Sequence, residues 1–209
     1  MMKDIIIAGA SRSGKSTLSR MINDRYGHYV ISIDKLVAVF GQAYPELDIR
    51  LNWNRDKTTG NIAPFLGHCL GVFSSSDGKG LSDYSHGEVP GNKFVLEGAY
   101  YDFDKISHIL RTYGIKDMRD RFCLIGLVQR EKDEDAFIRD FRKYDTKKDW
   151  TYDLSDEELK GVAADMVEFN NEMYHNLASY GFNIYDTSGD REAVFELILS
   201  RLDSEMSQK

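Results

Sequence analysis

Residues 5–16 read IIIAGASRSGKS, an apolar run that leads directly into a glycine-rich segment of the form G-x-x-x-x-G-K-S. The run Ile5–Ala8 is typical of a central parallel strand covered on both faces, and a helix is expected from Gly14 to about Tyr26. Between a strand and a helix, the glycines let the backbone wrap so that successive N–H groups point at phosphate oxygens. The start of the helix adds the positive end of its dipole. The stretch therefore predicts a phosphate loop, Gly9 to Ser16, for a nucleoside triphosphate.

Two side chains of the phosphate loop are expected to bind the nucleotide directly. Lys15 would bridge the β- and γ-phosphates, and the Ser16 hydroxyl would coordinate Mg²⁺. Arg12 either helps to hold phosphate or points to solvent. The full expected binding set of this region is Gly9, Ala10, Ser11, Arg12, Ser13, Gly14, Lys15, Ser16 and Thr17.

The phosphate loop alone does not distinguish ATP from GTP. Guanine-specific GTPases carry Asn-Lys-x-Asp after a strand, whereas residues 54–57 read NRDK, in the wrong order and at the wrong place. Residues 186–189 read DTSG, similar to the D-x-x-G switch of GTPases, but they lie too late in the chain. ATP with Mg²⁺ is therefore the expected nucleotide.

Short apolar strands alternate with helical patterns along the rest of the chain. Further strands are expected at residues 29–33, 94–97, 122–128 and 182–185, and helices at 61–73, 106–114, 137–144, 155–180 and 191–202. This alternation predicts a single α/β domain, residues 1–209, with helices on both faces of a parallel sheet. Ligands bind beyond the carboxyl ends of such strands, so Gly9, Asp34, Glu97 and Asp186 are expected to be neighbours.

The composition argues against several classes of protein. The chain has 209 residues, a formal charge of −7 and no dense basic block, so it is not expected to bind nucleic-acid backbones. Its apolar runs are too short to span a membrane, and its start lacks the apolar core of a signal peptide. Cys69 and Cys123 lie far apart on apolar patterns, as expected of buried thiols in a reducing compartment. A cytoplasmic protein is expected.

With this loop and layout, the chain resembles the nucleoside-monophosphate-kinase-like group of P-loop kinases. The group includes adenylate, shikimate and gluconate kinases and chloramphenicol phosphotransferase. The resemblance covers the whole domain in layout but only a few motifs in detail. It implies a three-layer P-loop NTPase fold whose five-stranded parallel sheet has the order 2-3-1-4-5, with helices on both faces. It also implies an acceptor-binding segment within residues 41–92 and an arginine-bearing lid at about residues 129–150.

Two carboxylates occupy positions that carry function in this group. Asp34, just after the second expected strand, would accept or orient the proton of the attacking hydroxyl, because phosphoryl transfer needs positioning and a proton acceptor. Alternatively, Asp34 caps a helix that starts at Lys35. Glu97 resembles the acidic residue that holds Mg²⁺ through water or contacts the acceptor, or it is an ordinary carboxylate at a strand end.

Arg139 and Arg142 form an R-x-x-R pair on the helix expected after strand four. At this spacing they are expected to share a face, while Phe137, Phe141 and Tyr144 are directed inward. The resemblance implies that such lid arginines neutralise charge in the transition state. A solvated charged face is the alternative, since several acidic residues lie nearby.

Two further residues complete the expected nucleotide site. Arg130, immediately after strand four, is a third candidate lid arginine. Thr187 belongs to the loop at residues 186–189, which in this group touches adenine, largely with backbone atoms.

The sequence does not identify the acceptor. Side chains that could line its site are Arg50, Trp53, Arg55, Tyr84 and His86. One hypothesis is an ATP-dependent phosphotransferase that moves the γ-phosphoryl group to a hydroxyl or phosphate of a small molecule. The other is an ATP-binding regulatory module in which the nucleotide state sets the conformation of residues 41–92 for a protein partner. The arginine pair favours the first, because a transferase needs such side chains and a passive sensor does not.

Overall fold

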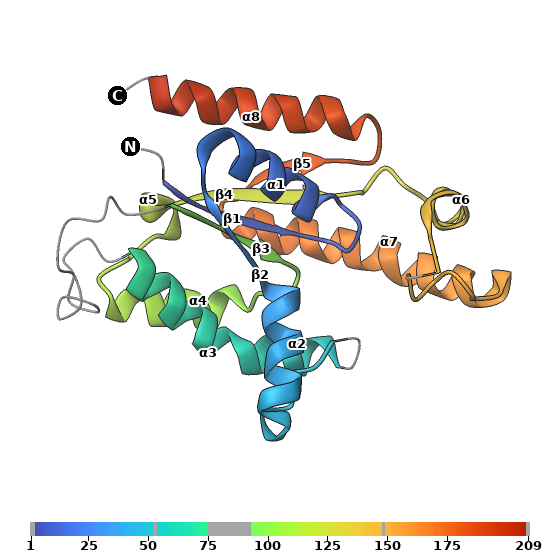
Figure 1. Ribbon diagram of the computed structural model, residues 1–209, viewed down its shortest axis with the longest axis horizontal. Helices are drawn as coiled ribbons and strands as arrows, with labels where there is room; N and C mark the ends of the chain where they lie inside the picture. Colours follow the sequence, from blue (N-terminus) through green and yellow to red (C-terminus); the bar gives the residue numbers. More distant parts are fainter. Residues whose placement is uncertain (1–2, 52–53, 75–92, 148, 208–209) are drawn as a thin grey trace.

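Five parallel strands form one sheet at the centre of the molecule (Figure 1). The structure, a computed structural model, describes residues 3–51, 54–74, 93–147 and 149–207. The strands are β1 (Asp4–Gly9), β2 (Tyr29–Ser32), β3 (Phe94–Gly98), β4 (Phe122–Val128) and β5 (Asn183–Asp186). Their spatial order, β2-β3-β1-β4-β5, confirms the order that the resemblance implies. Every residue of β1 is buried in the middle of the sheet, as its continuous apolar run predicts.

Helices cover both faces of the sheet, and Figure 1 shows α1 and α8 on one side with α3, α4 and α7 on the other. The helices are α1 (Lys15–Tyr26), α2 (Ile33–Ala43), α3 (Arg55–Ser74), α4 (Phe103–Thr112), α5 (Met118–Arg121), α6 (Glu134–Tyr144), α7 (Asp156–Ser179) and α8 (Arg191–Ser207). In the part of the chain that the structure describes, none of them is long and apolar enough to cross a bilayer.

Side chains of the central strand alternate between two hydrophobic cores. Ile5 and Ile7 pack in the core that α1 and α8 complete. Ile6 and Ala8 pack in the larger core, which receives side chains from α2, α3, α4 and α7. This alternation follows from the extended backbone, because successive side chains of a strand point to opposite faces. The three-layer arrangement is therefore set by the buried central strand.

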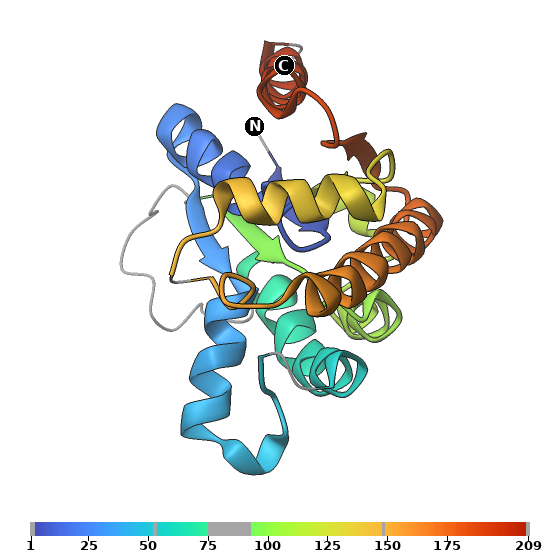
Figure 2. The same cartoon turned by 90° about the vertical axis from the view of Figure 1, so that its right-hand side faces the viewer.

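Helix α6 lies outside these two cores and packs on the first half of α7 (Figure 2). Phe137 and Phe141 are buried there against Leu159 and Ala163, which confirms their predicted inward direction. The same prediction for Tyr144 is wrong, because its side chain is 63% exposed. Tyr144 is the last residue of α6, where the packed surface has ended, and its side chain lines a cavity instead.

The region between β2 and β3 is more helical than predicted. Strand β2 ends at Ser32 and α2 begins at Ile33, so Asp34 lies in the first turn of that helix. Helix α3 also begins earlier than predicted, after Asn54, whose side chain accepts a hydrogen bond from the backbone N–H of Lys57 at 2.9 Å. The segment at residues 41–92, expected to bind the acceptor, therefore contains all of α3. Its residues 75–92 lie outside the described part of the chain.

Both cysteines carry free thiols and are half-buried. Burial raises the pKa of the Cys123 thiol to about 12, and it also raises the pKa of Cys69. Both thiols are therefore protonated at neutral pH.

Candidate active site

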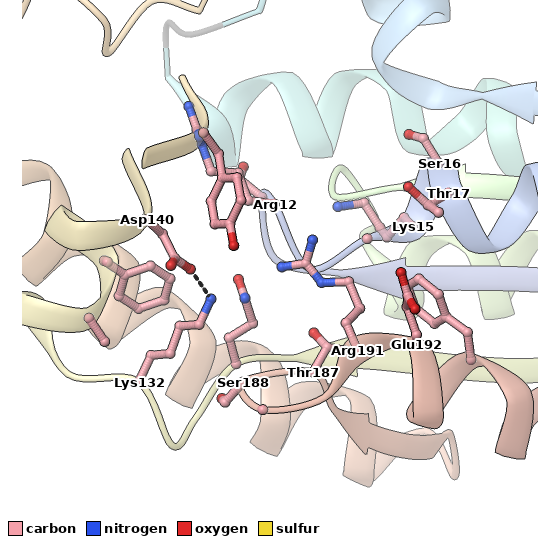
Figure 3. A pocket seen from close by; sticks show the side chains of 18 of the residues that line it. Arg12, Lys15, Ser16, Thr17, Lys132, Asp140, Thr187, Ser188, Arg191 and Glu192 are labelled. Atoms are coloured by element: carbon pink, nitrogen blue, oxygen red, sulfur yellow. Dashed lines mark hydrogen bonds and ion pairs between the residues drawn. The ribbon is translucent and has the colours of Figure 1, made fainter. Parts of the chain in front are cut away.

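A cavity of about 1200 Å³ opens beyond the carboxyl end of β1 (Figure 3). Its walls come from the phosphate loop and α1, the first turn of α2, helix α6 with the turn before it, and the start of α8. The predicted site residues that line it are Ser11, Arg12, Gly14, Lys15, Ser16, Thr17, Asp34, Arg139 and Thr187. Gly9, Ala10, Ser13 and Glu97 are buried behind this lining. Arg130 and Arg142 do not line it.

The phosphate loop is fixed against β4 and against the loop after β5. A Cβ atom on Gly9 would lie 2.2 Å from the carbonyl oxygen of Leu127, so the backbones can approach this closely only at a glycine. The buried hydroxyl of Thr187 lies 3.0 Å from the carbonyl oxygen of Ser13 and 3.2 Å from that of Val128. Thr187 thus ties the loop after β5 to the phosphate loop through its side chain, a role that its sequence position does not reveal.

Lys15 is a buried cation without a carboxylate in ion-pair distance among the described residues. Its Nζ donates a hydrogen bond to the carbonyl oxygen of Ala10 at 2.6 Å. Burial lowers the pKa of Lys15, and the negative charges of Asp34 and Glu97 offset this effect only in part. Because a buried ammonium without a close anion is unfavourable, the site favours an anion beside Lys15. The residues present therefore fit the phosphates of a nucleotide.

Ser16 and Glu97 lie together below the phosphate loop. The Ser16 hydroxyl donates to Glu97 Oε2 at 3.3 Å, and the Glu97 side chain is buried. Glu97 reaches this place because β3 pairs with β1 in a register that sets it beside Ile7. A hydroxyl and a carboxylate are oxygen ligands of the kind that Mg²⁺ prefers, so this pair fits a Mg²⁺ ion bound next to phosphate.

Asp34 faces the same cavity from the first turn of α2. Its carboxylate is accessible from the open cavity, yet the surrounding protein raises its pKa by desolvation. The charge of Glu97 adds to this rise and the charge of Lys15 opposes it. Ser32, not Asp34, occupies the N-cap position of α2, so Asp34 is not the helix cap proposed as an alternative. The carboxylate is available to a ligand in the cavity.

The predicted arginine pair is divided between two environments. Arg139 lines the cavity. Arg142 donates through Nη2 to Asp156 Oδ1 at 2.6 Å and to the carbonyl oxygen of Leu154 at 3.0 Å. The spacing of the pair fixes only where the side chains leave α6. The carboxylate at the start of α7 then determines where the long Arg142 side chain goes, and it does not enter the cavity.

Arg130 is also held outside the cavity. Its guanidinium lies over the ring of Tyr174, with Cζ 4.0 Å from the centroid, and its Nε donates to Asn171 Oδ1 at 3.2 Å. Both partners belong to α7, so Arg130 joins the start of the α6 region to that helix.

Arg191, the first residue of α8, lines the cavity although it was not among the predicted site residues. Figure 3 shows its guanidinium in the cavity between Lys132 and Lys15. Its Cδ would lie 3.1 Å from a Cβ atom on Gly14, so the side chain passes directly beside the phosphate loop. Its Nε is buried and has no hydrogen-bond partner within the described ranges. The available sequence signal is a cation in the first turn of a helix, where the helix dipole disfavours it.

Lys132 is a second cavity cation that the sequence did not single out. It lies on the α6 arm, which we define as residues 129–147 and 149–155, and it forms an ion pair with Asp140 of α6. In the amide orientation that satisfies both neighbours, the Gln129 side-chain oxygen accepts from Lys132 Nζ at 2.6 Å and from Arg191 Nη2 at 3.3 Å. One amide thus joins a cation of the arm, Lys132, to a cation of α8, Arg191.

A second cavity, of about 340 Å³, lies between α3, the segment after β3 and α7. The carboxylates among its described lining residues are Asp56, Asp102, Asp104 and Glu172, and the aromatic rings are Tyr101, Phe103, Phe169 and Tyr180. The Arg55 guanidinium lies over the Phe169 ring, 3.5 Å from its centroid. Burial raises the pKa of Tyr101 well above its usual value, and the charges of Glu97 and Asp34 add to the rise. The Tyr101 hydroxyl donates to the carbonyl oxygen of Leu96, the residue before Glu97, at 2.9 Å.

The residues predicted to line the acceptor site lie in different parts of the structure. Arg55 lines the second cavity. Arg50 instead binds the turn after α2, where its Nη2 donates to the carbonyl oxygen of Pro45 at 3.2 Å. Trp53, Tyr84 and His86 lie outside the described residues.

No protein-family model and no curated protein matches the sequence. In structure the chain is similar to shikimate kinase from Bacteroides thetaiotaomicron, with a TM-score of 0.56 and 14% identity over 99% of both chains. It is also similar to a gluconokinase from Sinorhizobium meliloti, with a TM-score of 0.55 and 13% identity over 99% of this chain and 94% of that one. At these identities the likeness shows the fold alone. Together with the sheet order and the strand–loop–helix at Gly9 to Ser16, it confirms the predicted three-layer P-loop NTPase fold.

Proposed function

We propose that this protein is an ATP-dependent phosphotransferase that moves the γ-phosphoryl group of Mg-ATP to a small molecule. The observation that carries the proposal is the buried ammonium of Lys15, which has no ion-pair partner in the described residues and shares a cavity with the Asp34 carboxylate. The ammonium suits the phosphates of the donor, and the carboxylate suits the hydroxyl of an acceptor. We place the enzyme in the cytoplasm, where ATP is supplied and the free thiols of Cys69 and Cys123 stay reduced.

On the donor side, cations and backbone N–H groups would surround the phosphates. The phosphates of ATP would be the anionic partner of the Lys15 ammonium. The phosphate loop and the start of α1 provide the N–H groups. Ser16 and Glu97 would hold Mg²⁺, which neutralises charge on the phosphate oxygens. Arg139 from α6 and Arg191 from α8 approach from the far wall and would stabilise the transferring group.

On the acceptor side, Asp34 would orient the attacking oxygen. Its carboxylate accepts a hydrogen bond from the acceptor hydroxyl and takes the proton as the bond from oxygen to phosphorus forms and the bond to ADP breaks. Little more is required of the protein, because phosphoryl transfer depends on positioning and on charge stabilisation.

We place the acceptor in the second cavity, next to Tyr101. One observation supports this placement: Tyr101 lines that cavity, and its hydroxyl donates at 2.9 Å to the carbonyl oxygen of Leu96, the residue before Glu97. Carboxylates outnumber the single lining cation, Arg55, among the described residues of this cavity. That balance favours neutral or cationic acceptors that carry hydroxyl groups over acceptors that carry phosphate.

A regulatory module with a protein partner is the second candidate. Apolar side chains are exposed along α2 and the turn that follows it: Val39 is 61%, Tyr44 52% and Leu47 44% exposed. In a module of this kind hydrolysis would be slow, and partner affinity would differ between the ATP and ADP states.

The deciding experiment is an acceptor screen with Mg-ATP. Polyols, amino alcohols, amino sugars, hydroxy acids and nucleoside monophosphates are each tested for ADP release and for transfer of a label from the γ-phosphate. We expect at least one hydroxyl-bearing class to accelerate ADP release and to acquire the label, with the Lys15→Ala protein as the control. Release that no acceptor accelerates, combined with partner capture in only one nucleotide state, would favour the regulatory module.

A further inference from the structure

Arg12 leaves the phosphate loop and binds the α6 arm. In Figure 3 its side chain is directed away from Lys15. Its Nη1 forms an ion pair with Asp145 Oδ1, and its Nη2 donates to Thr151 Oγ1 at 2.8 Å. The Thr151 hydroxyl donates in turn to Asp145 Oδ2, and the guanidinium lies over the Phe141 ring, with Cζ 4.8 Å from the centroid. The contact joins residues that are far apart in the sequence.

This contact is buried on the side of the arm. The Asp145 side chain is 3% exposed and Thr151 is 1% exposed, whereas the Arg12 side chain is 30% exposed. Both carboxylate oxygens of Asp145 are used, one by Arg12 and one by Thr151. Removing the cation would leave a buried carboxylate without its partner, which is strongly unfavourable. The ion pair is therefore part of the packing between the loop and the arm.

The backbone at Arg12 suits glycine better than arginine. Its φ of 63° lies in the left-handed region, where a Cβ atom is disfavoured. A glycine would adopt this conformation without that strain. The arginine therefore contributes through its side-chain contacts, and replacing it by glycine removes those contacts while leaving the loop conformation favourable.

We propose that Arg12, Asp145 and Thr151 form a latch that fixes the α6 arm against the phosphate loop before any nucleotide binds. The arm carries two cavity cations, Lys132 and Arg139. The latch holds the arm on the loop that receives the phosphates, so these cations are in place when ATP arrives. Arg12 is then a positioning residue and not a phosphate ligand. The expected effect of the latch on turnover rests on the proposed phosphotransferase function. The expected effect on the rigidity of the α6 arm does not.

Hydrogen exchange on the nucleotide-free protein tests the mechanical part. Backbone amides of α6 are followed in Arg12→Gly, Asp145→Asn and the double variant, with Arg20→Ala at an exposed position of α1 as the control, since alanine keeps the helix. We expect exchange about tenfold faster or more in both single variants, no change in the control, and no further increase in the double variant. Arg12→Lys, which keeps the charge but not the two-pronged geometry, should restore little.

Binding and turnover separate a latch from a phosphate ligand. A latch predicts that Arg12→Gly and Asp145→Asn lower kcat by a similar factor, about 10- to 100-fold, while the affinity for ATP changes by less than about threefold. If no acceptor is found, the exchange and ATP-binding results still test the latch. Conversely, if the latch proposal fails, an acceptor screen can still demonstrate phosphoryl transfer.

Two outcomes would overturn the proposal. The first is unchanged exchange on α6 in both Arg12→Gly and Asp145→Asn. The second is a large loss of ATP affinity in Arg12→Gly that Asp145→Asn does not share, because that pattern identifies Arg12 as a phosphate ligand.

Discussion

The two cavities described above differ in what they are built around. The larger one surrounds the continuous phosphate loop, and its lining combines cations, among them Lys15, Arg139 and Arg191, with an equal number of carboxylates. The smaller one is assembled from three segments far apart in the chain and is lined mainly by carboxylates and aromatic rings, with Arg55 over the Phe169 ring. The first has the chemistry of a site for a polyanion, and the second has the chemistry of a site for a small polar molecule.

This difference indicates that one cavity binds a group common to all nucleotides, whereas the other selects a particular acceptor. Phosphate groups are the same in every nucleotide, so backbone N–H groups and a few charges suffice to hold them. An acceptor is distinguished by its shape and its polar groups, and these need side chains in a particular three-dimensional arrangement. Changes in the larger cavity should therefore abolish the reaction, whereas changes in the smaller one should alter which acceptor is used.

The largest effect is expected from Lys15→Ala. Loss of the ammonium removes the buried charge that faces the phosphates, so transfer should fall by about 1000-fold or more and ATP affinity should fall as well. Single-turnover transfer of labelled phosphate measures the first, and calorimetric titration with ATP the second. Stability should not decrease, because the buried charge is itself costly to the free protein. Transfer within tenfold of the natural protein would contradict the assigned role.

Asp34→Asn should give the next largest effect. The amide cannot take the acceptor proton, so turnover should fall by roughly 100-fold or more while ATP affinity stays nearly unchanged. Equal losses of ATP binding and of turnover would instead show that Asp34 interacts with ATP and not with the acceptor.

The pH dependence of turnover sharpens the test of Asp34. Desolvation by the surrounding protein raises the pKa of this carboxyl, and the ionised form is the one that accepts a proton. Activity should therefore rise as pH increases through the raised pKa, and Asp34→Asn should remove that limb. The stability effect has the opposite sign. The folded state holds this proton more tightly than the unfolded state, so the contribution of Asp34 to stability falls as pH rises through the same interval. Urea unfolding of the two proteins at several pH values measures it.

Arg191→Ala and Arg142→Ala form a matched pair of intermediate size. Arg191 enters the cavity beside the phosphate loop, so its loss should lower kcat by roughly 10- to 100-fold. Arg142 is bound to the start of α7, so its loss should change kcat by less than about threefold. Steady-state kinetics on both variants checks the contrast. A larger effect at Arg142 would show that this arginine takes part in catalysis, as the sequence predicts for the pair.

The smallest effect is expected in the second cavity. Phe169→Leu keeps an apolar side chain but removes the ring beneath Arg55, a contact worth about 1 kcal/mol. The KM for the acceptor should rise several-fold while the KM for ATP stays constant. Phe73→Leu, at an exposed position near the end of α3, serves as the control. A change in the KM for ATP alone would show that this cavity does not serve the acceptor.

Much of the fold could be predicted because its signals are local. The buried run at Ile5–Ala8 indicates the central strand, and the glycines and Lys15 indicate the phosphate loop. The sequence predicts that α3 begins at residue 61 because Gly60 weakens the helical pattern before it, although Gly60 lies inside the helix. Tertiary contacts with α4 support this helix and outweigh the weak local propensity.

The side chains of the site were harder to predict than its backbone. Long cationic side chains go where a partner holds them, and those partners come from other parts of the chain. Asp156 holds Arg142 away from the cavity, and Asp145 holds Arg12 away from the phosphate position. Spacing along one helix contains no information about such partners. Arg191 enters the site for a different reason, because α8 packs beside Gly14 of the phosphate loop.

The protonated thiols also have a practical consequence. Maleimides and iodoacetamides react with thiolates, and the raised pKa values slow the reaction of Cys69 and Cys123 at neutral pH. The two native cysteines should therefore compete little with an introduced cysteine in site-directed labelling. Cysteines introduced by Trp150→Cys and Leu197→Cys, both at exposed positions, would take a pair of fluorophores. Energy transfer between them would report the movement of the α6 arm relative to α8 in single molecules.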